Sequence, residues 1–357
     1  MIKPKKLNRG DRVAIVSLSS GILGEDDCRH QLQLGIDRIK DFGLIPVFMP
    51  NALKGNSFLS ENPKARADDL KSAYFDDSIK AVFCAIGGDE TYRILPFLME
   101  DQLFLNKVKT SPKIFSGFSD TTNNHLFFFK LGVISFYGPN FLSDLAELES
   151  EMLPYTKKAF LSFFNNDYNR LIESSEVWYQ ERTDFSIKAL KTKRIVHQET
   201  KGYEVINGFG KVKGRLLGGC LESLYDGYTG DRYFEQKLVY EKYQLMPNLI
   251  DWQDKILFFE TSEEQPNPTL YRKYLDELGK RGVLDVVKAV LVGKPQNEVY
   301  YQEYIEILND FAKIYNLPIM YNLNFGHAYP RNVIPYGILT EIDFDNLTVT
   351  LIENMLE

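Results

Sequence analysis

Short hydrophobic runs alternate with amphipathic stretches along the first half of the chain. The runs are continuously apolar, which is typical of strands buried on both faces of a parallel sheet. The stretches between them carry apolar residues at helical spacing, as Leu32, Ile36 and Ile39 do. This alternation predicts an α/β domain built on a parallel sheet. The expected strands are Val13–Leu18, Ile45–Met49, Lys80–Ile86 and Lys113–Ser116, and the expected helices are Cys28–Phe42, Pro63–Tyr74, Thr91–Met99 and Thr121–Leu131.

The middle of the chain, from about Asn165 to Gly210, is polar and charged and has no clean periodicity. We interpret it as a linker with an insertion that covers a cleft. Hydrophobic runs then return and predict a second domain. Its expected elements are strands at Gly210–Leu217, Lys255–Phe259, Val286–Val292 and Ile319–Leu323, a turn at Gly218–Leu221, a helix at Thr269–Leu278 and a hairpin at Thr340–Ile352. The predicted domains are residues 1–165, the insertion 166–209, and residues 210–357.

Length and charge narrow the class of protein. A chain of 357 residues exceeds the size at which one hydrophobic core usually stops growing, which favours two domains. There are 49 Asp and Glu against 42 Lys and Arg, a net charge of −7, whereas proteins that bind nucleic-acid polymers normally present a basic surface. Three cysteines, Cys28, Cys84 and Cys220, are too few and too scattered for a disulfide framework or a zinc site.

No hydrophobic segment approaches the roughly 18 residues that a membrane-spanning helix needs. Basic residues precede the apolar run Val13–Leu18, as in a signal peptide, but the run is shorter than the roughly 7–15 residues of a signal-peptide core. We therefore expect no membrane association and a cytoplasmic location.

Ser119 is the first candidate for chemistry, because it lies where a predicted strand turns into a predicted helix. Gly117 leaves room for a tight turn, and a helix start offers free N–H groups. The pattern resembles the nucleophile elbow G-x-S-x-G, with Thr121 in place of the second glycine. The alternative is structural, since Ser and Asp are also the preferred N-cap residues of helices.

A serine nucleophile needs a base, and the chain has four histidines. His125 follows Ser119 by about 600° of helical rotation and so faces elsewhere. His327 follows Gly326 in a loop after a predicted strand, where catalytic groups are common. A loop histidine bonded to the backbone is the alternative.

Glu260 ends the buried run Ile256–Phe259, and a carboxylate at a strand end is placed to orient an imidazole. Glu263 and Glu264 compete for that role, but attachment to a strand fixes Glu260 best. The alternative is a strand-end residue that is exposed to water or caps the next helix.

Gly87-Gly88-Asp89 follows another predicted strand and lacks the spacing of a phosphate-binding loop. We expect the N–H of Gly88 to act with the N–H of Asp120 as an oxyanion donor. Asp89 is also a good helix N-cap, and both roles are compatible. No cluster of residues has metal-ligand spacing, so no metal and no cofactor are predicted.

A set of motifs in fixed order resembles the LD-carboxypeptidase family of serine peptidases, nearest to its microcin C self-immunity branch. The motifs are the strand, Gly-Gly-Asp and helix of Ala81–Leu95, the Gly117–Asp120 turn, Phe136–Pro139, Gly214–Leu221, the strand end at Glu260, and Gly326-His327. Each motif is weak alone, whereas their order and spacing from about Lys6 to Ile352 are specific. The resemblance implies a flavodoxin-like N-terminal domain, a C-terminal β-rich α/β domain and a homodimer.

The resemblance also implies a Ser-His-Glu triad without metal, in which Ser119 is the nucleophile, His327 the base and Glu260 its orienter. Ser119 and Glu260 are 260 − 119 = 141 residues apart, closer to the immunity branch, whose extra loop covers the substrate. Trp178 falls in that loop, where the branch has a tryptophan that stacks on a nucleobase; a structural plug is the alternative. Cys220 replaces the usual Asn of the GGxL turn and, like Asp89, is expected to bind substrate.

These inferences favour a serine carboxypeptidase or amidase that cleaves an amide bond in a small peptidyl or aminoacyl nucleotide. One alternative is a carboxypeptidase that trims L,D-linked murein tetrapeptides. The other is a non-catalytic protein that binds a small molecule, in which Ser119 is only a helix cap; fold alone does not exclude it.

Overall fold

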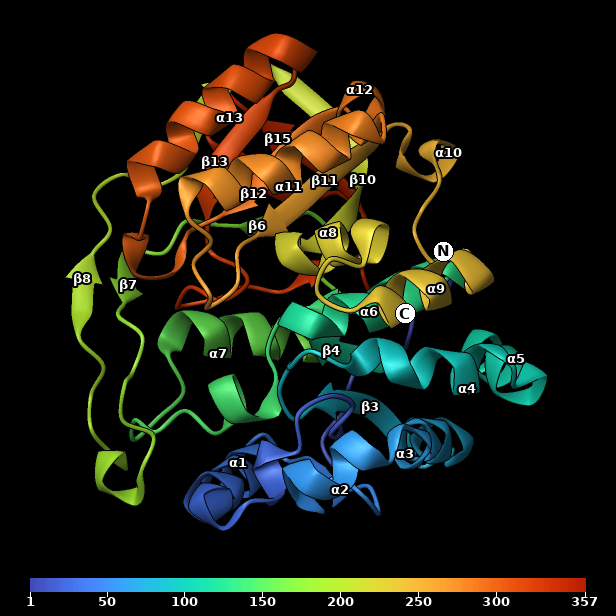
Figure 1. The fold of residues 1–357 in the computed structure, drawn as a ribbon. Helices are drawn as coiled ribbons and strands as arrows, with labels where there is room; N and C mark the ends of the chain where they lie inside the picture. The colour runs from blue at the N-terminus through green and yellow to red at the C-terminus, as the bar shows by residue number, and fades with distance from the viewer. The chain divides into compact units, whose positions relative to one another are not determined.

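The computed structural model describes all 357 residues, Met1–Glu357, and the chain divides into two compact units. The first unit comprises residues 1–166, 182–194 and 356–357, and the second comprises residues 167–181 and 195–355. The elements of both are labelled in Figure 1. None of the helices combines the length and the hydrophobicity that crossing a bilayer requires.

The first unit is built on parallel strands in the order β2-β1-β3-β4-β5. This is the flavodoxin-like order. In this order ligands bind beyond the carboxyl ends of the strands, near the topological switch point between the neighbouring strands β1 and β3. The predicted fold class is therefore confirmed for this unit. Its elements are β1 (Arg12–Val16), β2 (Ile45–Phe48), β3 (Ile79–Cys84), β4 (Ile114–Gly117), β5 (Phe136–Tyr137), α1 (Arg29–Asp41), α2 (Gly55–Glu61), α3 (Pro63–Phe75), α4 (Leu95–Met99), α5 (Gln102–Thr110), α6 (Thr122–Lys130) and α7 (Pro154–Leu161).

The second unit contains an eight-stranded sheet in the order β6-β16-β15-β10-β11-β12-β13-β9. Strands β10 to β13 are parallel at its centre, and antiparallel strands flank them. Helix α11 packs against α8 and against α13 beside this sheet (Figure 1). The elements are β6 (Arg170–Ile172), β9 (Glu204–Asn207), β10 (Lys211–Cys220), β11 (Lys255–Glu260), β12 (Ala289–Gly293), β13 (Ile319–Leu323), β14 (Ile334–Pro335), β15 (Leu339–Asp343), β16 (Thr348–Leu351), α8 (Leu221–Thr229), α9 (Phe234–Tyr243), α10 (Leu249–Trp252), α11 (Pro268–Lys280), α12 (Val283–Val286) and α13 (Tyr301–Tyr315).

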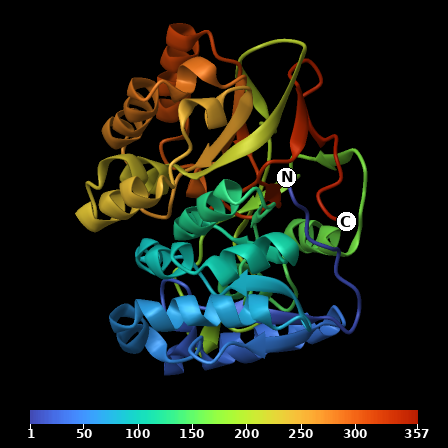
Figure 2. The same ribbon diagram turned by 90° about the vertical axis from the view of Figure 1, so that its right-hand side faces the viewer.

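Most predicted elements are present, and the C-terminal hairpin β15–β16, red in Figure 2, turns at Asp345-Asn346 as expected. Four details differ, and the fourth concerns the strand that leads to Cys220. The stretch expected to be an aperiodic insertion contains the short strands β6, β7 (Val177–Tyr179), β8 (Val196–Gln198) and β9, and β6 and β9 form the two edges of the second sheet. Val286 ends a short helix instead of beginning a strand. The expected helix at Thr91–Met99 begins as a 3₁₀ turn and becomes α-helical at Leu95.

The expected turn at Gly218–Leu221 is also wrong, because β10 continues through Cys220 and pairs with β11 up to Glu260. Gly218 is needed because β10 and β11 approach each other closely at this position, and no turn occurs there. A Cβ on Gly218 would lie 1.6 Å from the carbonyl oxygen of Phe258. The strand therefore delivers Cys220 to a position directly beside Glu260.

Candidate functional site

Ser119 lies at a sharp junction in the first unit. Strand β4 ends at Gly117, and Ser119 begins a 3₁₀ turn that leads into α6. Its φ of +66° is in the left-handed region, which a residue with a Cβ rarely adopts. The Ser119 N–H donates to Tyr137 Oη at 3.0 Å. A strained, half-buried serine between a strand and a helix is the geometry that the nucleophile-elbow interpretation expects.

The loop after β3 packs directly against this serine. A Cβ on Gly87 would lie 2.8 Å from Ser119 Cβ, so only glycine allows the approach. The N–H groups of Gly88 and Asp120 donate to no acceptor within the chain. Both therefore remain available to an oxyanion, which is consistent with the predicted donors. Asp89, the next residue in the loop, is exposed.

A buried network lies beneath these donors, and sequence reasoning missed it. Asp120 accepts hydrogen bonds from Ser19 Oγ at 2.6 Å, from the Thr91 N–H at 2.8 Å and from Asn123 Nδ2 at 2.6 Å. Burial raises the pKa of Asp120, and the hydrogen bonds from Ser19 and Thr91 oppose the shift. Ser19 also touches the glycine loop, since a Cβ on Gly88 would lie 2.5 Å from its Oγ. The one available signal was its place after β1, at the point where the strand order reverses.

His125 is a structural residue in α6. Its Nδ1 and Nε2 lie 2.8 Å from Ser135 Oγ and 3.0 Å from the Gly117 carbonyl oxygen. The side chain is fully buried, and burial lowers its pKa to about 3. Both ring nitrogens are therefore engaged, and the conclusion that His125 is not the base of Ser119 agrees with this geometry.

Glu260 and His327 meet in the second unit. His327 Nδ1 lies 2.8 Å from Glu260 Oε2, and the His327 N–H donates to the same oxygen at 2.9 Å. Both side chains are buried. The glycines around them make this possible, since a Cβ on Gly326 would lie 2.1 Å from Glu260 Cγ, and one on Gly293 would lie 2.6 Å from Glu260 Cβ. Glycine precedes His327 because the Glu260 carboxylate occupies that space.

The other imidazole nitrogen has an unexpected partner. His327 Nε2 lies 2.8 Å from Glu263 Oε2. Burial disfavours the charged imidazole, but the charge of Glu260 and the hydrogen bonds to both carboxylates outweigh it and raise the pKa of His327 to about 10. The hydrogen bond from His327 in turn lowers the pKa of Glu263 to about 2. Sequence reasoning considered Glu263 only as a rival of Glu260, whereas the structure uses both carboxylates, one on each nitrogen.

Cys220 lies beside Glu260 and is buried. Its Sγ donates to Glu222 Oε2 at 3.3 Å, and Glu222 Oε1 accepts from the N–H and the Oγ of Ser262, each at 2.8 Å. Burial, together with the charge of Glu260, raises the pKa of Glu222 to about 7. The thiol thus faces a second carboxyl group that also holds the start of the loop carrying Glu263.

Trp178 lies on β7, half-buried, with one ring face stacked on His197 of β8 at a centroid distance of 4.0 Å. The buried ammonium of Lys294 is 5.2 Å from the Trp178 ring centroid. Lys294 Nζ also pairs with Glu199 at 2.9 Å and Glu298 at 2.5 Å. The indole is therefore held in place by the second unit itself.

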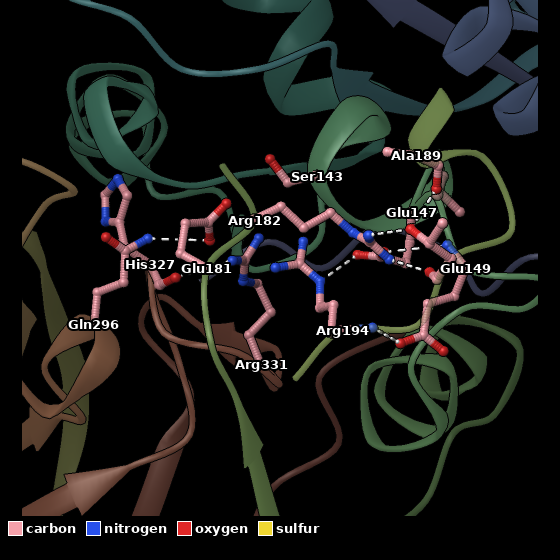
Figure 3. Close-up of polar contacts among 12 residues, drawn as sticks. Ser143, Glu147, Glu149, Glu181, Arg182, Ala189, Arg194, Gln296, His327 and Arg331 are labelled. Carbon is pink, nitrogen blue, oxygen red and sulfur yellow. Dashed lines mark hydrogen bonds and ion pairs between the residues drawn. The ribbon is translucent and has the colours of Figure 1, made fainter. Parts of the chain in front are cut away.

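Residues 182–194, which lie between β7 and β8, belong to the first unit and are fixed there by ion pairs. Glu147 accepts from Arg182 Nε at 3.1 Å and from Arg194 Nε at 2.8 Å, and all three side chains are buried (Figure 3). The Arg194 N–H donates to Glu149 at 2.6 Å.

In the second unit, Arg331 donates to the carbonyl oxygen of His327 at 3.2 Å.

These features define a class of protein: a two-unit α/β protein with polar groups at the carboxyl ends of parallel strands in each unit. In the first unit the residues are Gly88, Ser119 and Asp120, and in the second they are Glu260 and His327. No group of three or more His, Cys, Asp or Glu side chains is arranged to hold a metal ion.

Comparison with known proteins places the chain within this class. Residues 13–138 match the LD-carboxypeptidase N-terminal domain, and residues 213–342 match the LD-carboxypeptidase C-terminal domain. The chain therefore belongs to the LD-carboxypeptidase family, and the resemblance drawn from the motifs is confirmed.

Relatives with different names share this family. The microcin C7 self-immunity protein of Escherichia coli is 26% identical over 312 residues, covering 85% of this chain and 82% of that protein. A Bacillus subtilis protein named "Probable murein peptide carboxypeptidase" is 26% identical over 342 residues, covering 94% and 89%. The crystal structure of an MccF-like protein from Streptococcus pneumoniae in complex with AMP has a TM-score of 0.91 and 47% identity, covering 95% of this chain and 98% of that one.

Proposed function

We propose that the protein is a serine hydrolase of carboxypeptidase type with Ser119, His327 and Glu260 as its catalytic triad. The observation that carries the proposal is the buried hydrogen bond of 2.8 Å between Glu260 Oε2 and His327 Nδ1. A carboxylate on Nδ1 fixes the tautomer and the direction of the imidazole, as the base of a serine nucleophile requires. The strained backbone of Ser119 supports its assignment as that nucleophile.

In this mechanism Ser119 Oγ attacks the carbonyl carbon of a substrate amide while His327 Nε2 takes its proton. The N–H groups of Gly88 and Asp120, which have no acceptor in the chain, stabilise the oxyanion. His327 then gives the proton to the leaving nitrogen, and the C–N bond breaks. Water releases the acyl group from Ser119 in a second step with the same base.

The substrate we favour is a peptidyl or aminoacyl nucleotide. The similar protein from Streptococcus pneumoniae was crystallised with AMP, and a nucleobase stacks well on an aromatic ring. We propose that Trp178 supplies that ring, with His197 supporting its other face. Asp89 and Cys220 remain predicted substrate contacts, and the homodimer and the cytoplasmic location also remain predictions.

A murein tetrapeptide is the second candidate, favoured by the murein-directed name of the Bacillus subtilis relative. A third is a binding protein without activity. An activated-serine probe distinguishes this third case, since it should label Ser119 and His327→Ala should abolish the labelling.

The deciding experiment compares an aminoacyl sulfamoyl adenosine with a murein tetrapeptide as substrates of the purified protein. Ser119→Ala should lower turnover by a factor on the order of 10⁶ with folding intact. Trp178→Ala should weaken nucleotide cleavage about tenfold or more and leave serine labelling unchanged, since a lost stack costs about 1–3 kcal/mol. Equal loss on both substrates, with a fall in thermal stability, would identify Trp178 as a structural plug and favour the murein peptide.

A further inference from the structure

Glu263 combines two properties that a purely structural carboxylate does not need. Its side chain is 65% exposed, yet its Oε2 lies 2.8 Å from Nε2 of a buried histidine. It stands on the loop that follows β11, three residues after Glu260. The start of this loop is anchored from beneath by the two hydrogen bonds from Ser262 to Glu222. The carboxylate is therefore held close to Nε2 while the solvent side of the group stays open.

Nε2 is the nitrogen that must exchange a proton with Ser119 in the proposed mechanism. An imidazole with a carboxylate on each nitrogen is held as the cation, and a cation cannot accept a proton. Catalysis therefore requires the bond between Nε2 and Glu263 to break. When it breaks, Glu263 loses the cation that balances its charge.

Each of the neighbouring carboxylates already has an ion-pair or hydrogen-bond partner of its own. Glu264 pairs with Arg232 at 3.0 Å, and Glu260 accepts two hydrogen bonds from His327. Glu222 accepts two hydrogen bonds from Ser262, and its pKa is raised to about 7. Arg232 adds favourable charge near Glu263 but forms its ion pair with Glu264. Glu263 is thus an exposed carboxylate whose paired cation is the proposed catalytic base itself.

We infer that Glu263 determines specificity by binding the free α-ammonium group of the amino acid whose carbonyl carbon is attacked. The inference rests on the proposed function. The α-nitrogen of an aminoacyl group lies about 2.5 Å from its carbonyl carbon, and that carbon must be close to Nε2 when Ser119 attacks. A substrate ammonium therefore arrives where Glu263 stands and replaces the imidazolium as its partner. The preferred substrate class is an aminoacyl compound with a free amine, in preference to one that is N-blocked or extended at its N-terminus.

The test measures binding, so that it does not depend on turnover. Alanyl sulfamoyl adenosine and its N-acetyl derivative are titrated calorimetrically against Ser119→Ala, Ser119→Ala/Glu263→Gln and Ser119→Ala/Glu264→Gln proteins. The alanyl side chain carries no charge, so the two ligands differ only at the amine. The Ser119→Ala protein should bind the free amine about tenfold or more tightly, as expected for a charge-assisted hydrogen bond. Glu263→Gln should reduce that ratio to near one, and the matched Glu264→Gln variant should retain it.

An amine preference that survives Glu263→Gln, or no preference in the Ser119→Ala protein, overturns the inference. The same two ligands are then offered to the protein with Ser119 intact. Absence of hydrolysis of both counts against the proposed activity on nucleotides, while the binding ratios still decide the role of Glu263. A thermal unfolding scan of each variant shows whether Glu263→Gln has disturbed the fold, and Glu263→Asp, which keeps the charge, should restore part of the preference.

Discussion

Replacing Glu263 with glutamine measures how strongly its carboxylate holds a proton on His327. The substitution removes a negative charge 2.8 Å from Nε2 and leaves the Glu260 bond to Nδ1 in place. Two unit charges about 4 Å apart interact by about 1 kcal/mol in water and about 4 kcal/mol at an effective dielectric constant near 20. One pKa unit corresponds to about 1.4 kcal/mol. Because Glu263 is 65% exposed, solvent screening favours the lower value, and we expect the pKa of His327 to fall by about one unit.

The assay is a proton NMR titration of the imidazole Cε1–H signals, which can be assigned by single substitutions because the chain has four histidines. The His327 signal should titrate near pH 10 in the unchanged protein and about one unit lower in Glu263→Gln. Glu264→Gln is the matched control and should leave the midpoint in place, since Glu264 pairs with Arg232. A His327 midpoint near the ordinary 6.5, or one that Glu263→Gln does not move, would refute the reasoning.

Three further predictions concern stability. Gly326→Ala should lower the free energy of unfolding by about 1–3 kcal/mol, because its Cβ would meet Glu260; Gly210→Ala, also at positive φ but with open space around it, isolates the backbone contribution in the same urea titration. Burial lowers the pKa of His125 to about 3, so only the unfolded chain binds its proton between pH 6.5 and 3. As the pH decreases through this range, the free energy of unfolding should therefore decrease by up to about 1.4 kcal/mol per pH unit. Urea midpoints in His125→Gln should lose this slope, and an unchanged slope contradicts the assignment. Glu147→Gln should cost about 3–5 kcal/mol by breaking two buried ion pairs, and trypsin should then cleave between β7 and β8 faster; unchanged cleavage would show that other contacts hold this segment.

The sequence was sufficient to predict the parallel strands of the first unit, because each is a continuous apolar run between clear turn signals. It was insufficient for β6 and β9, which are three and four residues long. Each lies at a sheet edge with a partner on one side only, so its residues need not be uniformly apolar. Their position depends on pairing with residues distant in the chain, as when β6 pairs with β16. Local periodicity carries no information about such pairing.

The candidate site divides in the same way. Ser119, Glu260 and His327 were named from their places after strands, which local pattern indicates well. Strand ends do not reveal loop conformation, so the approach of Glu263 to Nε2 was missed. Ser19 was missed for the same reason, since its bond to Asp120 joins residues 101 positions apart.

Cysteine chemistry offers a rival nucleophile, and the structure argues against it. A thiol attacks as the thiolate, so a nucleophilic cysteine needs a lowered pKa. Burial raises the pKa of Cys28 and raises that of Cys84 to about 12. Burial also raises the pKa of Cys220, and the charges of Glu222 and Glu260 raise it further. Cys220 therefore stays a neutral thiol beside Glu260, and the proposed acyl transfer depends on Ser119.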